Sequence, residues 1–77
     1  MRARVTVRLK SAVLDPQGET IERALHGLGF GGAHNVRVGK IIELDVADGT
    51  SKEQLEKMAD DLLANPVIET YSVEMLG

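Results

Sequence analysis

The 77-residue sequence contains no cysteine and no tryptophan, and it has only one phenylalanine, one tyrosine and two histidines. The absence of cysteine excludes disulfide bonds and metal sites built on thiolates. A chain of this length buries only about 60–65% of the surface that its unfolded form exposes, so one core provides marginal stability. Because small domains gain stability from disulfides, metals or association, we expect this chain to self-associate.

Long apolar runs and an excess of basic residues are also lacking. No window approaches the ~20 apolar residues that cross a bilayer, and the N-terminus begins in a strand pattern instead of an apolar signal region. The formal net charge is −3, so no overall positive field attracts nucleic acid. We expect a soluble, cytoplasmic protein with no membrane or nucleic-acid partner, formed by a single domain over residues 1–77.

The N-terminal part of the sequence predicts a strand followed by a helix. Apolar and polar side chains alternate over residues 3–9, as in a strand with one buried face. Asp15 can accept a hydrogen bond from an unpaired amide of a first helical turn, and Pro16 suits the first helical position. Gly29 supplies a stop. The apolar stripe of this helix comprises Ile21, Ala24, Leu25 and Leu28.

The segment at residues 36–46 fits one long strand better than two short ones. A two-residue turn at Gly39 and Lys40 would place apolar side chains opposite polar ones. A continuous strand keeps its apolar residues on one face, and Gly39 then marks a bend or a bulge. Lys40 is the one misfit, since it lies in the apolar phase of this strand.

A second helix and a last strand complete the predicted order. Two overlapping capping boxes, at residues 50–53 and 51–54, can begin the helix. Pro66 ends it at Asn65, because the residue before a proline avoids the α conformation, and a strand follows over residues 67–75. This β-α-β-α-β order predicts an α+β fold, a two-layer sandwich of ferredoxin-like layout with two helices on one face of a largely antiparallel sheet.

Two opposite charges lie in phase with apolar residues of their strands. Lys40 does so in the middle strand, and Glu69 does so in the last, where its phase includes Tyr71. A partly solvated salt bridge between neighbouring strands would account for both charges. A position at a subunit contact would account for them equally well, and the sequence leaves these two interpretations open.

No motif in the sequence indicates catalysis, a cofactor or a metal. The stretch "GLGFGG" matches G-x-G-x-x-G, but it closes a helix and precedes a strand, which reverses the context of a nucleotide-binding loop. His26 and His34 lie eight residues apart with no cysteine or carboxylate cluster nearby, which gives a metal site little support. We expect no catalytic residue, no cofactor and no metal ligand in this chain.

Four basic side chains alternate along and just beyond the first strand, and they raise the question of RNA binding. Sheet proteins that bind RNA stack bases on exposed aromatic rings. Phe30 and Tyr71 are the only phenylalanine and tyrosine, and both lie outside this strand. A solvated strand face, or a patch that docks an acidic partner, is the better interpretation.

Three blocks of sequence together resemble one family. They are "LKSAVLDPQG" at residues 9–18, "VRVGKIIEL" at residues 36–44 after an earlier "GF", and "LLANPVIETYSVE" at residues 62–74. In this order and at this chain length they resemble the PurS family, the small subunit of phosphoribosylformylglycinamidine (FGAM) synthase in purine biosynthesis. The combination is specific, although no block is a catalytic signature.

The resemblance implies a non-catalytic accessory role in a ligase complex. In such systems a large synthetase subunit uses ATP and Mg²⁺, and a glutaminase subunit releases ammonia from glutamine. The small subunit, usually a dimer, is similar to an adaptor that brings these two together so that ammonia passes between them. The implied partners of this chain are therefore further copies of itself, as a homodimer or a tetramer, and these two larger subunits.

The family blocks also point to residues for contact with partners. Gly18 draws attention because glycine in a first helical turn costs up to roughly 1 kcal/mol relative to alanine. We expect this side-chain-free turn to admit a partner backbone, so that Gly18→Ala would stabilise the isolated chain and weaken the complex. The full set of candidates is Asp15, Gln17, Gly18, Arg37, Lys40, Asn65, Glu69 and Tyr71.

Two other classes of function have a similar composition. A free-standing regulatory module could bind a small effector at a dimer interface, and it would show saturable ligand binding without a protein partner. A small nucleic-acid-binding module is the weaker alternative, and steeply salt-dependent binding would reveal it.

Overall fold

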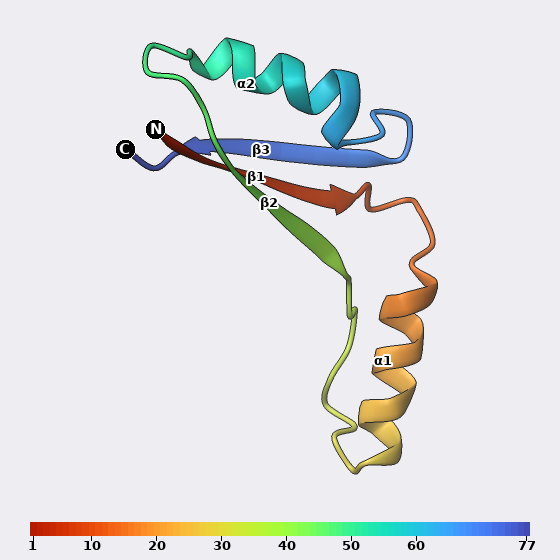
Figure 1. The fold of residues 1–77 in the computed structure, drawn as a ribbon. Helices are drawn as coiled ribbons and strands as arrows, with labels where there is room; N and C mark the ends of the chain where they lie inside the picture. Colours follow the sequence, from red (N-terminus) through yellow and green to blue (C-terminus); the bar gives the residue numbers. More distant parts are fainter.

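The computed structural model describes all residues from 1 to 77 and confirms the predicted order of strands and helices (Figure 1). The second helix continues directly into one turn of π-helix, η1. None of the helices has the length and apolar character that a bilayer span requires. The elements are β1 (Arg2–Leu9), α1 (Pro16–Gly27), β2 (Gly39–Asp45), α2 (Lys52–Met58), η1 (Ala59–Leu63) and β3 (Glu69–Met75).

The three strands form one antiparallel sheet in the order β2-β1-β3. β1 occupies the centre and pairs along both of its edges, with Val5 opposite Ile42 on one side and opposite Val73 on the other. Because directly opposite residues share a face of the sheet, the alternation predicted for residues 3–9 organises all three strands. The α+β class and the antiparallel sheet are therefore confirmed.

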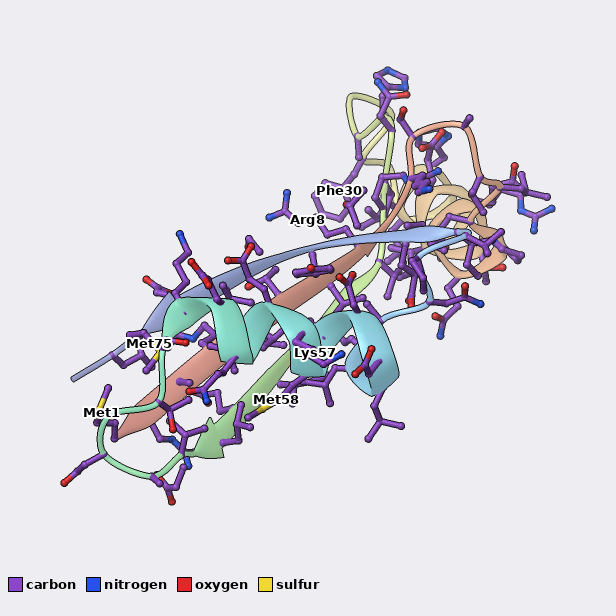
Figure 2. The ribbon with its side chains drawn as sticks, turned by 90° about the horizontal axis from the view of Figure 1, so that it is seen from above. Met1, Arg8, Phe30, Lys57, Met58 and Met75 are labelled. Atoms are coloured by element: carbon purple, nitrogen blue, oxygen red, sulfur yellow. The ribbon has the colours of Figure 1, made fainter.

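The buried core lies between β1 and the second helix. Ala3, Val5 and Val7 project from one face of β1 and meet Leu55 and Ala59, which come from α2 and η1. Viewed from above, α2 and η1 cross over the sheet (Figure 2). Only 8 of the 77 residues are buried, so the core of a single chain is small.

The opposite face of the sheet is mostly polar, apart from Ile41, and several of its charges pair with one another. Arg4 lies between Glu43 and Glu74, with a distance of 3.4 Å from a guanidinium nitrogen to each carboxylate. Arg2 lies 3.3 Å from Asp45. These acidic residues are the cross-strand neighbours of the two arginines, which supports the interpretation of a solvated strand face.

We expected both helices to cover the sheet, but the first helix does not pack on it. α2 covers one face of the sheet. α1 and the segment that follows it, residues 28–38, extend away from the end of the sheet, and we call them the arm (Figure 1). The radius of gyration is 15.7 Å, against about 11.5 Å expected for a compact domain of this length. The apolar stripe of α1 therefore remains largely uncovered, with Ile21 43% exposed and Leu28 73% exposed.

The ends of several elements also differ from the prediction. β2 begins at Gly39, so residues 36–38 are not part of the expected long strand. Of the two possible capping boxes, Ser51 with Gln54 forms, with both reciprocal hydrogen bonds in place. β3 begins at Glu69 because residues 65–68 form a turn.

Candidate functional site

The place where α1 joins the sheet brings together most of the residues selected from the sequence. We call it the junction: the loop at residues 10–15, the first turns of α1, and residues 36–38. The last of these belong to the return segment, residues 28–38, which leads from α1 back to β2. Figure 1 shows this segment running beside α1 before it enters the sheet.

Asp15 links α1 to the return segment. One carboxylate oxygen accepts a hydrogen bond from the amide of Gly18 at 2.9 Å, which caps the helix as predicted, and the other accepts from the amide of Val38 at 2.7 Å. These two bonds, that of Val38 first, hold the pKa of Asp15 below its ordinary value of 3.8 against the opposing effect of desolvation, and the nearby Arg37 adds to the lowering. The side chain fixes how the arm leaves the sheet.

The backbone of Val36 comes so close to residue 18 that only glycine fits there. A Cβ atom at this position would overlap the carbonyl oxygen of Val36 and lie 3.0 Å from a carboxylate oxygen of Asp15. The backbone that the glycine admits is therefore that of the return segment, and Gly18 itself is buried. Our expectation that Gly18→Ala would stabilise the isolated chain is wrong, because the added methyl group has no space.

Two further side chains hold the same crossing. Glu22 accepts a hydrogen bond from the amide of Val36 at 3.2 Å. Arg37 donates from one guanidinium nitrogen to the carbonyl oxygens of Lys10 and Val13, at 3.0 and 2.9 Å. The return segment is thus tied at three successive residues, to α1 and to the loop at residues 10–15.

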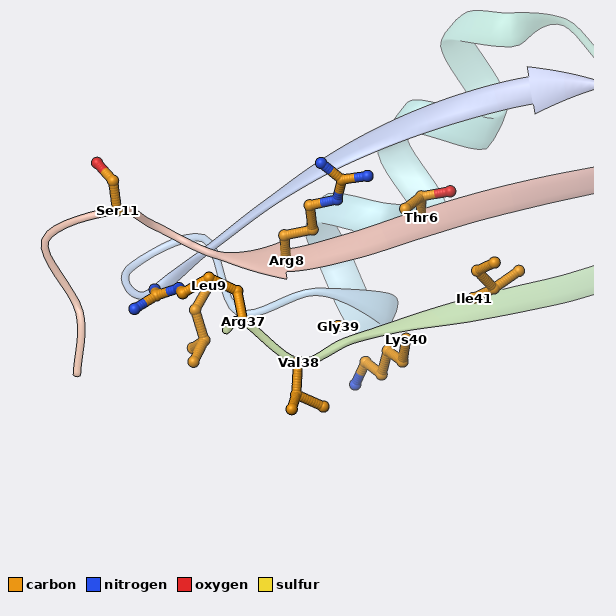
Figure 3. Close-up of a pocket in the computed structure, with 9 residues that line it drawn as sticks. All are labelled: Thr6, Arg8, Leu9, Ser11, Arg37, Val38, Gly39, Lys40 and Ile41. Carbon is orange, nitrogen blue, oxygen red and sulfur yellow. The ribbon is translucent and has the colours of Figure 1, made fainter. Parts of the chain in front are cut away.

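An open hollow of about 520 Å³ lies beside this crossing, between the first two strands. Figure 3 shows its lining, which includes Arg8 from β1, Lys40 from β2 and Arg37 from the return segment. Arg8 lies opposite Gly39 and Lys40 lies opposite Val7, so the two cations belong to opposite faces of the sheet. They do not converge on one point, and the hollow lacks the geometry of a built anion site.

The charge on Glu69 is met within the chain. Its carboxylate accepts a hydrogen bond from the amide of Asn65 at 2.7 Å, and the carbonyl oxygen of Asn65 accepts from the amide of Glu69, also at 2.7 Å. The Asn65 side chain accepts from the amide of Val67 at 3.0 Å. No ion pair joins Lys40 to Glu69, so the proposed salt bridge between them is wrong, although both line a smaller hollow at the junction.

Tyr71 lies away from the junction, half-buried against the core. Desolvation, followed by the neighbouring carboxylates of Asp60 and Glu56, raises the pKa of Tyr71 above its ordinary value of 10.0. The side chain is opposite Val7 in the sheet, on the face that the second helix covers. This packing explains why Tyr71 lies in the apolar phase of its strand.

The structure therefore assembles six of the eight selected residues around the junction and separates two. Asn65 closes the turn before β3, and Tyr71 packs on the core. Glu22 was missed by the sequence reasoning, because nothing in its local pattern distinguishes it from a solvated helix residue. The six at the junction are Asp15, Gln17, Gly18, Arg37, Lys40 and Glu69.

Comparison with known proteins agrees with the resemblance over the whole chain. Residues 2–77 match the PurS family model, described as phosphoribosylformylglycinamidine (FGAM) synthase. A Synechocystis relative, named as the synthase subunit PurS, is 44% identical over 75 residues, which cover 94% of this chain and 75% of the relative.

Solved structures give the same result. Bacillus subtilis PurS superposes with a TM-score of 0.85 at 40% identity, covering 95% of this chain and 94% of that one. A chain in the structure of PurLQS from Thermotoga maritima has a TM-score of 0.81 at 38% identity, covering 97% and 95%. Both the sequence and the fold match along nearly their entire length, and the chain therefore belongs to the PurS family.

Proposed function

We propose that this chain is the small accessory subunit of FGAM synthase and acts in purine biosynthesis as part of that ligase complex. The observation that supports this most directly is the fit of the whole chain to a component of the Thermotoga PurLQS assembly. Relatives from several organisms carry the name of the synthase subunit PurS. The chain contributes to an enzyme, and we assign the chemical steps to the other subunits.

The geometry supports the role of an adaptor. The polar groups of Asp15, Glu22 and Arg37 are engaged by backbone groups of the same chain, where they fix the arm. The arm also exposes large apolar side chains, since Leu28 and Phe30 are 73% and 60% exposed. Exposed apolar surface of this kind marks places where proteins contact one another.

We infer that copies of the chain associate as a homodimer or a tetramer through this arm. A domain with 8 buried residues gains stability when a second copy covers its apolar surface. The assembled small subunit then bridges the glutaminase and the synthetase in the cytoplasm and supports the passage of ammonia between them. ATP and Mg²⁺ belong to the large synthetase subunit in this proposal.

The proposal is tested by assaying the synthetase and glutaminase subunits of the same organism with and without this chain. Glutamine and ammonium are compared as nitrogen donors. We expect glutamine-driven synthesis to require the chain, whereas ammonium-driven synthesis largely survives without it. If neither activity responds to the chain, the adaptor role is excluded.

A further inference from the structure

A group of three side chains in the arm has the composition of a transition-metal site. Glu22 and His26 lie one turn apart on α1, and His34 faces them from the return segment. One donor atom from each of these residues lies within 4.8 Å of the other two. The imidazole rings of the two histidines are 5.7 Å apart and are arranged edge to face. This juxtaposition depends on the fold, because the sequence separates His34 from Glu22 by a helix end and a glycine-rich loop.

Hydrogen bonds already orient two of the three side chains for metal binding. Nε2 of His26 lies 2.7 Å from the carbonyl oxygen of Ala33. Since a carbonyl oxygen only accepts, Nε2 carries the proton and Nδ1 keeps its lone pair free. One oxygen of Glu22 accepts from the amide of Val36, which leaves the second oxygen available. Metal-binding histidines and carboxylates in proteins have supporting partners of this kind.

The three side chains can move close enough together to bind one metal ion. With zinc–nitrogen bonds of about 2.0–2.1 Å, neighbouring ligand atoms in a tetrahedral site lie roughly 3.4 Å apart. Both histidines are exposed, so modest rotations of their side chains can close the remaining distance. We propose that Glu22, His26 and His34 form a site for a divalent transition-metal ion, with Zn²⁺ as its natural probe and water in the fourth position.

A metal at this site would clip the return segment to α1 near the far end of the arm. The hydrogen bonds of Asp15 and Glu22 tie the crossing at the near end. At the far end, the hydrogen bond between His26 and the carbonyl oxygen of Ala33 joins the loop to α1, and a metal bound by His34 would add a second link. A ligand that binds only the folded state adds stability by mass action. The site would therefore stiffen the surface that carries Leu28 and Phe30 without taking part in catalysis.

The test is calorimetric titration of the full, untagged chain with ZnCl₂, followed by Mg²⁺ as a comparison. We expect saturable binding of one Zn²⁺ per chain in the micromolar range and none of Mg²⁺, because imidazole donors favour zinc over magnesium. His34→Ala should weaken Zn²⁺ binding at least about tenfold. Glu19→Gln, which removes an exposed carboxylate from the same helix outside the cluster, should leave it unchanged.

Nuclear magnetic resonance of the imidazole nitrogens provides an independent measurement. On addition of Zn²⁺, the Nδ1 signal of His26 should shift strongly, while Nε2 keeps its proton. Unchanged affinity in His34→Ala, or the absence of saturable binding in the unmodified chain, would overturn the metal site. Neither measurement uses synthase activity, so the metal site and the adaptor role stand or fall separately.

Discussion

At the scale of single residues, the polar groups of the junction act within the fold. Asp15, Glu22 and Arg37 each bond to backbone groups of a different segment. The amide of Gly18 that Asp15 caps is buried, and a buried backbone amide left without a partner is costly, so the Asp15 side chain is required even when the chain is alone. Gln17 and Lys40 are exposed, and they remain candidates for contact with another protein.

Gly18→Ala tests the close approach of the return segment to α1. Because the added Cβ overlaps the carbonyl oxygen of Val36, we expect the free energy of unfolding to fall by about 1–3 kcal/mol. Urea denaturation at a fixed chain concentration measures this change. Gly27→Ala is the matched control in the same helix: its Cβ meets nothing within 4 Å, so the substitution should be neutral or slightly stabilising. A neutral Gly18→Ala would contradict the proposed packing.

Asp15 contributes a pH dependence whose direction follows from its pKa. The pKa in the folded chain lies below the ordinary value of 3.8, so between these two values the unfolded chain binds more protons. The contribution is therefore present above about pH 4 and is lost as the pH falls below it. In Asp15→Asn, the urea midpoint should drop at neutral pH and depend less on pH in the acid range. Glu19→Gln, which removes an exposed carboxylate from the helix that Asp15 caps, should keep the original acid profile.

At the scale of elements, the two helices have opposite relations to the sheet. α2 contributes Leu55 to the core, whereas α1 keeps its stripe outside it. An isolated helix of 12 residues is marginal in water, so α1 depends on its cap, on the return segment and on contacts with other chains. The arm is therefore the element whose order is most sensitive to assembly.

Ser51→Ala tests which capping box begins α2. The hydroxyl of Ser51 accepts from the amide of Gln54 at 3.1 Å, and the Gln54 side chain accepts from the amide of Ser51 at 2.9 Å. We expect this substitution to lower the free energy of unfolding by about 1 kcal/mol. Glu53→Ala removes only the alternative box, and it should stay within about 0.5 kcal/mol of the unmodified chain. The reverse order of these effects would show that the alternative box forms in solution.

At the scale of the whole molecule, the chain is an elongated body with extents of 49 × 26 × 14 Å and a small core. Its sheet face opposite α2 is balanced by internal ion pairs. Uncovered apolar side chains lie on the arm, Leu28 among them, and also in η1 and the turn before β3, where Leu62 and Val67 are exposed. A shape of this kind provides area for contacts with several proteins at once.

Leu28→Ser tests whether the arm holds the assembly together. Leu28 is 73% exposed in the single chain, so its replacement changes little within one copy and removes apolar area from a covered interface. We expect sedimentation velocity to show a shift toward monomer, with a dissociation constant of the assembly at least about tenfold larger. Arg23→Ser, an exposed polar change on the same helix, should sediment like the unmodified chain. Equal assembly of both variants would place the interface elsewhere.

Much of the local structure could be predicted because its causes are local. The alternation over residues 3–9 became the central strand. Asp15 and Pro16 begin α1, and the φ of Gly29 is +97°, as the residue after a helix end requires. The family could also be recognised from three blocks of sequence, and these blocks contain residues of the junction and of the last turn.

The rest was decided by tertiary structure, for a physical reason common to each case. Local pattern indicates that a helix has an apolar face, but only the path of the whole chain determines what that face meets, and α1 meets no sheet. The neighbour of Gly18 and the meeting of Glu22 with His34 are likewise contacts made by the loops that join the elements. The order of the elements, the cap of the first helix and the family follow from the sequence alone. The path of the folded chain sets the exact element ends, which charges pair and which surface is left for other proteins.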